Sequence, residues 1–204
     1  MKILVIGGTG TIGSAIVREL SSRHTIIVAA RKGDVQVDIS DPKSIEAMYQ
    51  TVGQVDAVVS AAGTVHFASL SEMNADLYDI GLKNKLMGQV NLVLLGFPYL
   101  KERGSFTLTS GILSHDPILG GTAAAMVNGG IESFIKSAAI DMPKCLRING
   151  VSPTILKETI GRSKYTNYFR GYEPVSAFCV ALAYSKSVEG AQTGQIYRVG
   201  YTLP

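Results

Sequence analysis

The sequence predicts a three-layer α/β fold, in which a doubly wound parallel sheet of about seven strands carries helices on both faces. Three observations predict it. Short β-branched runs alternate with longer helical patterns, as in βαβ units. The first strand runs directly into a glycine-rich turn. Of the 204 residues 46% are hydrophobic, which suits one buried core, so we expect residues 1–204 to form a single domain.

Seven short apolar segments are expected to be strands: 2–6, 25–30, 35–38, 55–59, 105–109, 146–151 and 195–199. Helical spacing of apolar residues predicts five helices: 12–22, 42–52, 74–102, 121–141 and 174–186. Asp41-Pro42 and Glu173-Pro174 look like helix starts, because proline is favoured in the first helical turn. The stretch 152–172 breaks the periodicity. We expect there either a lid or a loop whose aromatic residues cover the edge of the sheet.

The charge and the cysteines exclude several classes of protein. The formal net charge is only +3 and the Lys and Arg residues are scattered, so no nucleic-acid partner is expected. Cys145 and Cys179 lack metal-ligand spacing, so we expect no metal site and two reduced thiols in the core. No stretch approaches the ~20 apolar residues of a membrane helix. We therefore expect a cytoplasmic protein without a membrane partner.

A glycine-rich turn joins the first strand to the first helix. It reads Gly7-Gly8-Thr9-Gly10-Thr11-Ile12-Gly13. Gly7 permits a tight turn, Gly10 lets a pyrophosphate approach the backbone, and Gly13 lets the helix pack closely on the strand. In this context such a turn binds phosphates at the helix N-terminus. The prediction is a Rossmann fold that holds a nicotinamide dinucleotide; the alternative is an ordinary glycine-rich turn.

The end of the second strand bears on the choice of cofactor. A protein specific for NAD usually places a carboxylate there for the ribose 2′-hydroxyl, whereas this chain has Ala29-Ala30-Arg31-Lys32. The guanidinium of Arg31, helped by Lys32, is suited to a 2′-phosphate, so we expect NADP(H) in preference to NAD(H). In the alternative interpretation Arg31 is a solvated charge and Asp34 takes the hydroxyl.

Further motifs follow in order along the chain. They are Asp38-Ile39-Ser40, Ser60-Ala61-Ala62-Gly63, Thr109-Ser110-Gly111, the run from Arg147 to Pro153, and Thr193-Gly194-Gln195. In this series the chain resembles the short-chain dehydrogenase/reductase family along nearly its full length. The resemblance implies that Asp38 and Ile39 meet the adenine. It further implies that Ala62 and Gly63 approach the nicotinamide ribose, that Thr154 and Ile155 lie against the carboxamide, and that Ala61 and Pro153 belong to the same cofactor site.

The resemblance fails at the family's proton relay. The family places a Tyr-x-x-x-Lys pair on the helix after the serine strand, with the tyrosine as acid and the lysine lowering its pKa. Here those positions hold Ala124 and Asn128, and no Tyr-x-x-x-Lys occurs anywhere in the sequence. The family's active-site asparagine, three residues before a glycine, corresponds to Lys85 before Gly88. An alanine methyl cannot transfer a proton, so the family's activity does not carry over unchanged.

Three hypotheses address the missing pair. In the first, the protein is an NADP(H)-dependent oxidoreductase for a small carbonyl, alcohol or enone substrate. Ser110 then binds the carbonyl, and Lys85, His115 or a tyrosine of 165–172 supplies the proton. In the second, the protein is an inactive sensor or interaction protein that binds NADP(H). In the third, it is a purely structural or interaction protein whose dinucleotide cleft is empty. We favour the enzyme. The alternative for Lys85 is a surface lysine, and for His115 a surface loop histidine is the favoured interpretation.

The helix expected over 121–141 also suggests an assembly. It carries a surface of small residues: Ala123, Ala125, Gly129, Gly130, Ser133, Ser137 and Ala138. In the family that this chain resembles, the same helix and the one before it form a two-fold interface, which implies a homodimer or a homotetramer. The alternative is that these small residues pack against the chain's own sheet.

Overall fold

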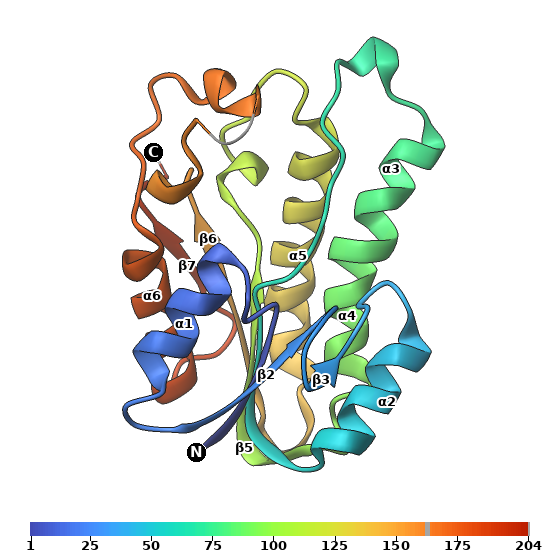
Figure 1. The fold of residues 1–204 in the computed structure, drawn as a ribbon, viewed down its shortest axis with the longest axis vertical. Coiled ribbons are helices and arrows are strands. Elements are labelled where there is room, and N and C mark those ends of the chain that lie inside the picture. The colour runs from blue at the N-terminus through green and yellow to red at the C-terminus, as the bar shows by residue number, and fades with distance from the viewer. Residues whose placement is uncertain (162–163, 204) are drawn as a thin grey trace.

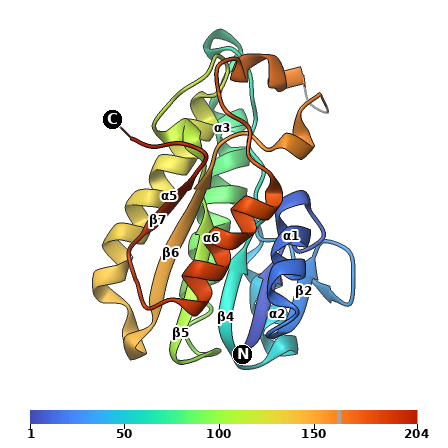
Figure 2. The same ribbon diagram turned by 90° about the vertical axis from the view of Figure 1, so that its left-hand side faces the viewer.

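The computed structural model of the protein describes residues 1–161 and 164–203. They contain a seven-stranded parallel sheet in the order β3-β2-β1-β4-β5-β6-β7. Figures 1 and 2 show helices layered on both faces of this sheet. The chain reverses its direction of winding between β1 and β4, and the carboxyl ends of such strands flank a crevice. The predicted three-layer Rossmann architecture is confirmed.

Most strands are short, and those in the middle of the sheet are apolar. Their bounds are β1 (Lys2–Ile6), β2 (Thr25–Ala30), β3 (Val35–Gln36), β4 (Val55–Ser60), β5 (Leu100–Thr109), β6 (Arg147–Pro153) and β7 (Ile196–Val199). The central strand β4 and its neighbour β1 are almost wholly buried. A strand covered by helices on both faces has no solvent side, so it reads as an apolar run and not as an alternating pattern.

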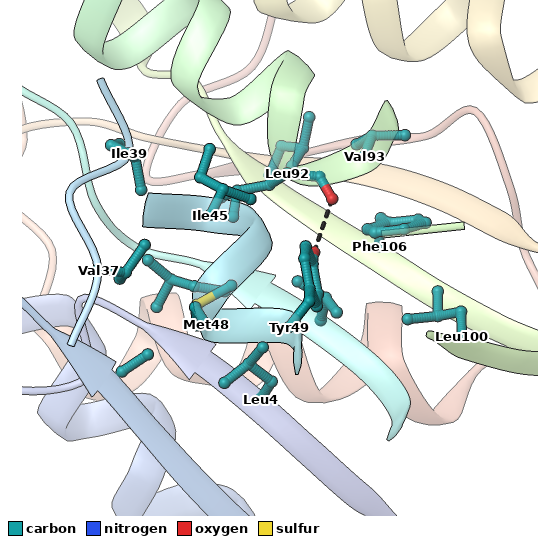
Figure 3. Packing of buried hydrophobic residues seen from close by; sticks show 14 of the residues in the cluster. Leu4, Val37, Ile39, Ile45, Met48, Tyr49, Leu92, Val93, Leu100 and Phe106 are labelled. Carbon is teal, nitrogen blue, oxygen red and sulfur yellow. Dashed lines mark hydrogen bonds between the residues drawn. The ribbon is translucent and has the colours of Figure 1, made fainter. Parts of the chain in front are cut away.

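The helices divide between two buried clusters. Their bounds are α1 (Thr11–Leu20), α2 (Pro42–Val52), α3 (Ala75–Gly81), α4 (Met87–Leu94), α5 (Thr122–Asp141) and α6 (Ala177–Glu189). α2, α4 and α5 pack on one face of the sheet, and α1 and α6 on the other. In the first cluster the hydroxyl of buried Tyr49 donates to the carbonyl oxygen of Leu92 over 2.6 Å (Figure 3). That bond satisfies the polar atom within an apolar core.

The long helix predicted over 74–102 is wrong after Leu94. The helix continues from α3 through a π-helical segment, Leu82–Leu86, into α4, and ends at Leu94. The chain then turns, and β5 begins at Leu100, earlier than expected, because Leu100 pairs with Val55 of β4. The run after Leu94 continues the apolar spacing of a helix, so pairing with a distant strand overrides the local pattern.

Two further expectations need correction. α6 begins at Ala177 and not at Pro174, because the hydroxyl of Ser176 accepts a hydrogen bond from the amide of Cys179 and caps the helix there. The two cysteines are free, as expected, but Cys145 and Cys179 are both exposed and are not core thiols. The helix start at Asp41 is confirmed, since its carboxylate accepts from the amide of Lys43.

The stretch 152–172 is only partly irregular. β6 extends to Pro153, and two 3-10 turns follow at Lys157–Thr159 and Lys164–Phe169, with residues 162–163 outside the described part. Figure 1 places this segment above the carboxyl ends of β6 and β7. Across the residues that the structure describes, no helix has the length and apolar character to cross a membrane.

Candidate active site

The glycine turn between β1 and α1 is held by backbone contacts. The amide of Gly7 donates to the carbonyl oxygen of Ala29 over 2.8 Å, and Gly7 has a φ of +77°. A Cβ added to Gly13 would lie 2.0 Å from the carbonyl oxygen of Gly7, so only glycine allows α1 to approach this closely. A Cβ on Gly10 would meet only that oxygen, at 3.4 Å, and otherwise open space. The chain thus leaves room beside Gly10 for a ligand.

A cavity of about 300 Å³ opens over this turn, and we call it the turn cavity. Its lining includes nine of the predicted cofactor residues: Gly7, Thr9, Gly10, Arg31, Asp38, Ile39, Ala61, Ala62 and Gly63. Gly10 caps α1 without a side chain, so no side-chain hydrogen bond caps the first turn of that helix. Unpaired amides at a helix N-terminus attract phosphate oxygens. The lining residues therefore fit a dinucleotide.

Of the charged residues that follow β2, only some line the turn cavity. Arg31, Lys32 and Asp34 are all exposed, but only Arg31 of the three belongs to the described lining of the cavity. The carboxylate of Asp38 accepts hydrogen bonds from the amide and hydroxyl of Ser40, and these bonds, with a smaller contribution from the charge of Arg31, lower its pKa. A cationic group therefore stands where the carboxylate of an NAD-specific protein would stand.

A second cavity of about 300 Å³ lies beside the first, and we call it the Lys85 cavity. It brings together the predicted residues Ile12, Lys85, Ser110, Pro153, Thr154 and Ile155, together with Ala124 and Asn128. Thr11 and Gly13 sit in the first turn of α1 and are absent from the described lining of both cavities. Thr154 is buried, and its hydroxyl has no hydrogen-bond partner. A buried hydroxyl without a partner is costly, and a ligand amide would satisfy it.

Lys85 is the cation of the second cavity. Its ammonium nitrogen donates to the side-chain oxygen of Asn128 over 2.6 Å and to the carbonyl oxygen of Ser110 over 3.3 Å. Gly63, with a φ of +147°, lies against the lysine stem, where a Cβ would fall 2.5 Å from its Cγ. The surrounding protein strips water from the ammonium and lowers the pKa of Lys85 to about 8. An acid with such a pKa exchanges protons near neutrality.

A buried carboxylate, which the sequence did not single out, stands behind Ser110. Glu132 of α5 accepts hydrogen bonds from the hydroxyls of Ser110 and Ser114 at 2.9 and 2.8 Å. A third hydroxyl, that of Ser152, lies at 3.3 Å from the same oxygen. Burial alone would raise the pKa of Glu132, but the hydrogen bonds together lower it. Glu132 falls four residues after Asn128, on the same face of the helix, which is the signal that sequence reasoning missed.

The other predicted acids lie elsewhere. His115 is absent from the described lining of the Lys85 cavity, because its Nε2 contacts the second oxygen of Glu132 at 2.7 Å. Phe169 lines the cavity and packs edge-on against Tyr172. The Tyr172 hydroxyl donates to the carbonyl oxygens of 116 and 117, and burial raises its pKa to about 12. Tyr168 is partly exposed, and the side chain of Tyr165 lies outside the described residues.

Comparisons with known proteins agree with this geometry. A sequence model of a protein family described as enoyl-(acyl carrier protein) reductase matches residues 11–177. The bifunctional ribulose 5-phosphate reductase/CDP-ribitol pyrophosphorylase Bcs1 of Haemophilus influenzae is 25% identical over 97% of this chain, which spans only 42% of that protein. Carbonyl reductase 2 of Sus scrofa, whose name specifies NADPH, is 25% identical over 80% of this chain and 75% of its own length.

Solved structures are similar along the whole chain. The protein lin1944 of Listeria innocua is 50% identical, with a TM-score of 0.95, covering 98% of this chain and 99% of that one. A small-chain dehydrogenase in complex with NADPH is 27% identical, with a TM-score of 0.87, covering 98% of this chain and 96% of that one.

Proposed function

Because this chain belongs to the short-chain dehydrogenase/reductase family, we propose that it is an NADP(H)-dependent oxidoreductase for a small carbonyl or enone substrate, with Lys85 as proton donor in place of the family's tyrosine. The observation that carries the proposal is the position of the Lys85 ammonium. It lies in a cavity with Ser110 and Asn128, beside the glycine turn.

The two adjoining cavities support binding of NADP(H). The glycine turn would hold the diphosphate, Arg31 the 2′-phosphate, and Thr154 the carboxamide, the last because its buried hydroxyl has no partner. The bound reduced nicotinamide supplies the hydride. A relative of solved structure is named as an NADPH complex, which agrees with a preference for NADP(H) over NAD(H) in this chain.

Lys85 supplies the proton. An ammonium has three N–H donors, and two of them go to Asn128 and to the carbonyl oxygen of Ser110. The third is left for a substrate oxygen in the cavity. When the substrate oxygen takes the proton, a neutral amine remains, held by the same partners, and a pKa of about 8 lets solvent recharge it.

The cavity wall bears on the class of substrate. Apart from Lys85, the described side chains that line the Lys85 cavity carry no formal charge, and apolar ones predominate, among them Val65, Phe67, Leu113, Leu156 and Phe169. An apolar wall with a few convergent polar groups is typical of sites for small organic molecules. We therefore propose a small, uncharged and largely apolar substrate.

A second candidate function is that of an inactive NADP(H)-binding sensor or interaction protein. The observation in its favour is Ala124, a buried methyl in place of the family's tyrosine hydroxyl. Loss of a general acid typically slows a reaction by about 10²–10⁴-fold, which does not by itself abolish turnover. The retained Lys85 cation leads us to favour the enzyme.

One experiment separates the two functions. Purified protein is titrated with NADPH and NADH by calorimetry, and NADPH oxidation is then followed with a panel of apolar aldehydes, ketones and enones. We expect NADPH to bind and at least one carbonyl compound to be reduced. Tight NADPH binding without any NADPH oxidation above background would contradict the enzyme and support the sensor. Binding of neither cofactor would contradict both functions.

We also propose a homodimer or homotetramer in the cytoplasm, acting through this one domain of 204 residues. Exposed apolar side chains lie on neighbouring helices, Met87 and Leu94 on α4 and Met126 and Ile140 on α5. Some of the small residues of α5 pack against this chain's own helices, and others remain free for contact with a second copy. Gly130 contacts Leu86 of the same chain, whereas a Cβ on Gly129 would meet open space. A surface of this kind suits close contact with a second copy.

A further inference from the structure

Glu132 is a buried carboxylate that the proposed hydride and proton transfers do not use. It lies on α5 with 3% of its surface exposed, directly behind Ser110 of the Lys85 cavity. A buried carboxylate is costly unless it is satisfied, and this one receives hydrogen bonds on both oxygens. Three serine hydroxyls approach one oxygen, and the His115 ring nitrogen approaches the other.

The charge of Glu132 decides the direction of each of these bonds. An ionised carboxylate can only accept hydrogen bonds, so every hydroxyl around it has to donate. The neighbouring His115, which forms an ion pair with Glu132 when protonated, favours the ionised form. Ser110 has a single hydroxyl proton, and that proton is directed to Glu132 over 2.9 Å.

Ser110 therefore has only lone pairs to offer a ligand in the cavity. The donor next to it is the Lys85 ammonium, which lies 3.3 Å from the Ser110 carbonyl oxygen. The site thus places one donor and one acceptor side by side in a largely apolar wall. A plain ketone satisfies the donor alone, whereas a hydroxyl beside the carbonyl would satisfy the acceptor as well.

We propose that Glu132 is a positioning residue that fixes Ser110 as a hydrogen-bond acceptor, so that the site selects α-hydroxy carbonyl compounds, and vicinal diols in the reverse direction. This inference rests on the proposed function. Lys85 binds and protonates the carbonyl oxygen, and Ser110 accepts the hydrogen bond of the neighbouring hydroxyl. Glu132 accepts the serine proton, which therefore points away from the substrate.

The test compares 2-hydroxyacetophenone with acetophenone, a pair that differs only in the hydroxyl. With wild-type protein and NADPH, we expect kcat/KM to favour the hydroxy ketone by roughly tenfold or more, the size of one satisfied hydrogen bond. Ser110→Ala removes the acceptor, and the preference is expected to fall to about one. Glu132→Leu removes the oxygen that accepts the serine proton, so Ser110 becomes free to donate and the preference falls there too.

Ser114→Ala is the matched control, because it removes another donor to Glu132 and leaves Ser110 in place. This variant is expected to keep the wild-type preference. Thermal unfolding and NADPH affinity show whether each variant is folded, and Ser110→Ala decides alone if Glu132→Leu does not fold. Equal kcat/KM values for the two ketones in wild-type protein, or an unchanged preference in Ser110→Ala, would overturn the inference.

Failure of the proposed function has a different signature. If NADPH binds and neither ketone is reduced, the enzyme proposal fails, and the inference is then judged by binding. Calorimetry of each ketone on NADP-saturated protein would support it if the hydroxy ketone binds roughly tenfold more tightly and loses that advantage in Ser110→Ala. Equal affinities, or no binding of either compound, would overturn it.

Discussion

The ammonium nitrogen of Lys85 lies 2.6 Å from the side-chain oxygen of Asn128, on two different helical segments. In the family pattern an asparagine corresponds to Lys85 and a lysine corresponds to Asn128. The resemblance thus implies that the two residue types have exchanged helices, and the structure brings Lys85 and Asn128 together at one cavity. Among the described side chains that line this cavity, Lys85 is the one able to release a proton near neutrality.

Removal of the Lys85 ammonium is expected to abolish most turnover. Lys85→Met keeps the length of the stem and deletes the donor, so kcat for carbonyl reduction falls by about 10²–10⁴-fold. NADPH affinity changes less than kcat, because the proposed contacts to the diphosphate and the 2′-phosphate lie in the turn cavity. Lys83→Met is the control, since Lys83 is exposed and pairs with Asp79. Equal losses in both variants, measured by NADPH oxidation, would contradict the role of Lys85.

The pH dependence follows from the same group. Burial lowers the pKa of Lys85 to about 8, and reduction needs the protonated form, so kcat/KM for reduction is highest below pH 8 and falls as the pH rises through it. For alcohol oxidation the neutral amine is needed, and the profile reverses. Asn128→Asp places a carboxylate next to the ammonium, which favours the charged form. The falling limb then moves to higher pH; an unmoved limb would assign it to another group.

Arg31 is expected to determine the preference for NADP(H). Arg31→Ala removes a charge-assisted bond to the 2′-phosphate, worth about 1.5–3 kcal/mol, and weakens NADPH binding by roughly 10–100-fold, with little effect on NADH. Lys43→Ala is the control, because Lys43 is exposed and absent from the described lining of the turn cavity. Calorimetry with both cofactors measures the effect. A clear NADH preference in the wild type would favour the alternative interpretation.

Two glycines of the turn are expected to fail in different ways when replaced. Gly10 has φ −79° and ψ 177°, which alanine adopts, so Gly10→Ala changes stability by no more than about 1 kcal/mol. Its methyl stands in the turn cavity and blocks the diphosphate. Gly13→Ala forces a methyl onto the backbone of Gly7 and costs at least about 1–3 kcal/mol. Thermal unfolding and NADPH titration of both variants separate the effects.

The proposed assembly is tested by charge on α4. Met87 and Leu94 are seven residues apart and share a face of the helix, so the double variant Met87→Lys, Leu94→Lys puts two charges into the expected interface. We expect light scattering to give a multiple of 21.7 kDa for the wild type and a smaller assembly for the variant. Leu119→Lys, on a loop residue that is more exposed than either, is the control. A monomeric wild type would refute the proposal.

The cofactor cleft was predictable because its signals are local. The turn from Gly7 to Gly13 follows a strand and precedes a helix, so its conformation is determined by neighbours in the sequence. The order of the later motifs located Ser110, Thr154 and Lys85, which the fold places around one cavity. Each of these residues follows a strand or lies on a helix whose position the βαβ pattern dictates.

The remainder depends on contacts between distant segments. In the sequence Glu132 looks like an ordinary helix carboxylate. Its contact with Ser110 exists only because the strand that ends near Ser110 packs against α5. His115 was a candidate acid on its intrinsic pKa alone, but it contacts this carboxylate on the far side of Ser110. The end of α4 was also hidden, because the apolar spacing runs on past Leu94 and only pairing with β4 converts the later residues to strand.

The π-helical segment Leu82–Leu86 has a consequence for how this chain tolerates insertions and deletions. A π turn takes up one residue more than an α turn. Deleting that residue would rotate the two flanking helical stretches by about 100° relative to each other, so that either Lys85 would leave its cavity or Leu92 would leave the core. We therefore expect this stretch to accept exchanges of side chain far more readily than any alteration of its length.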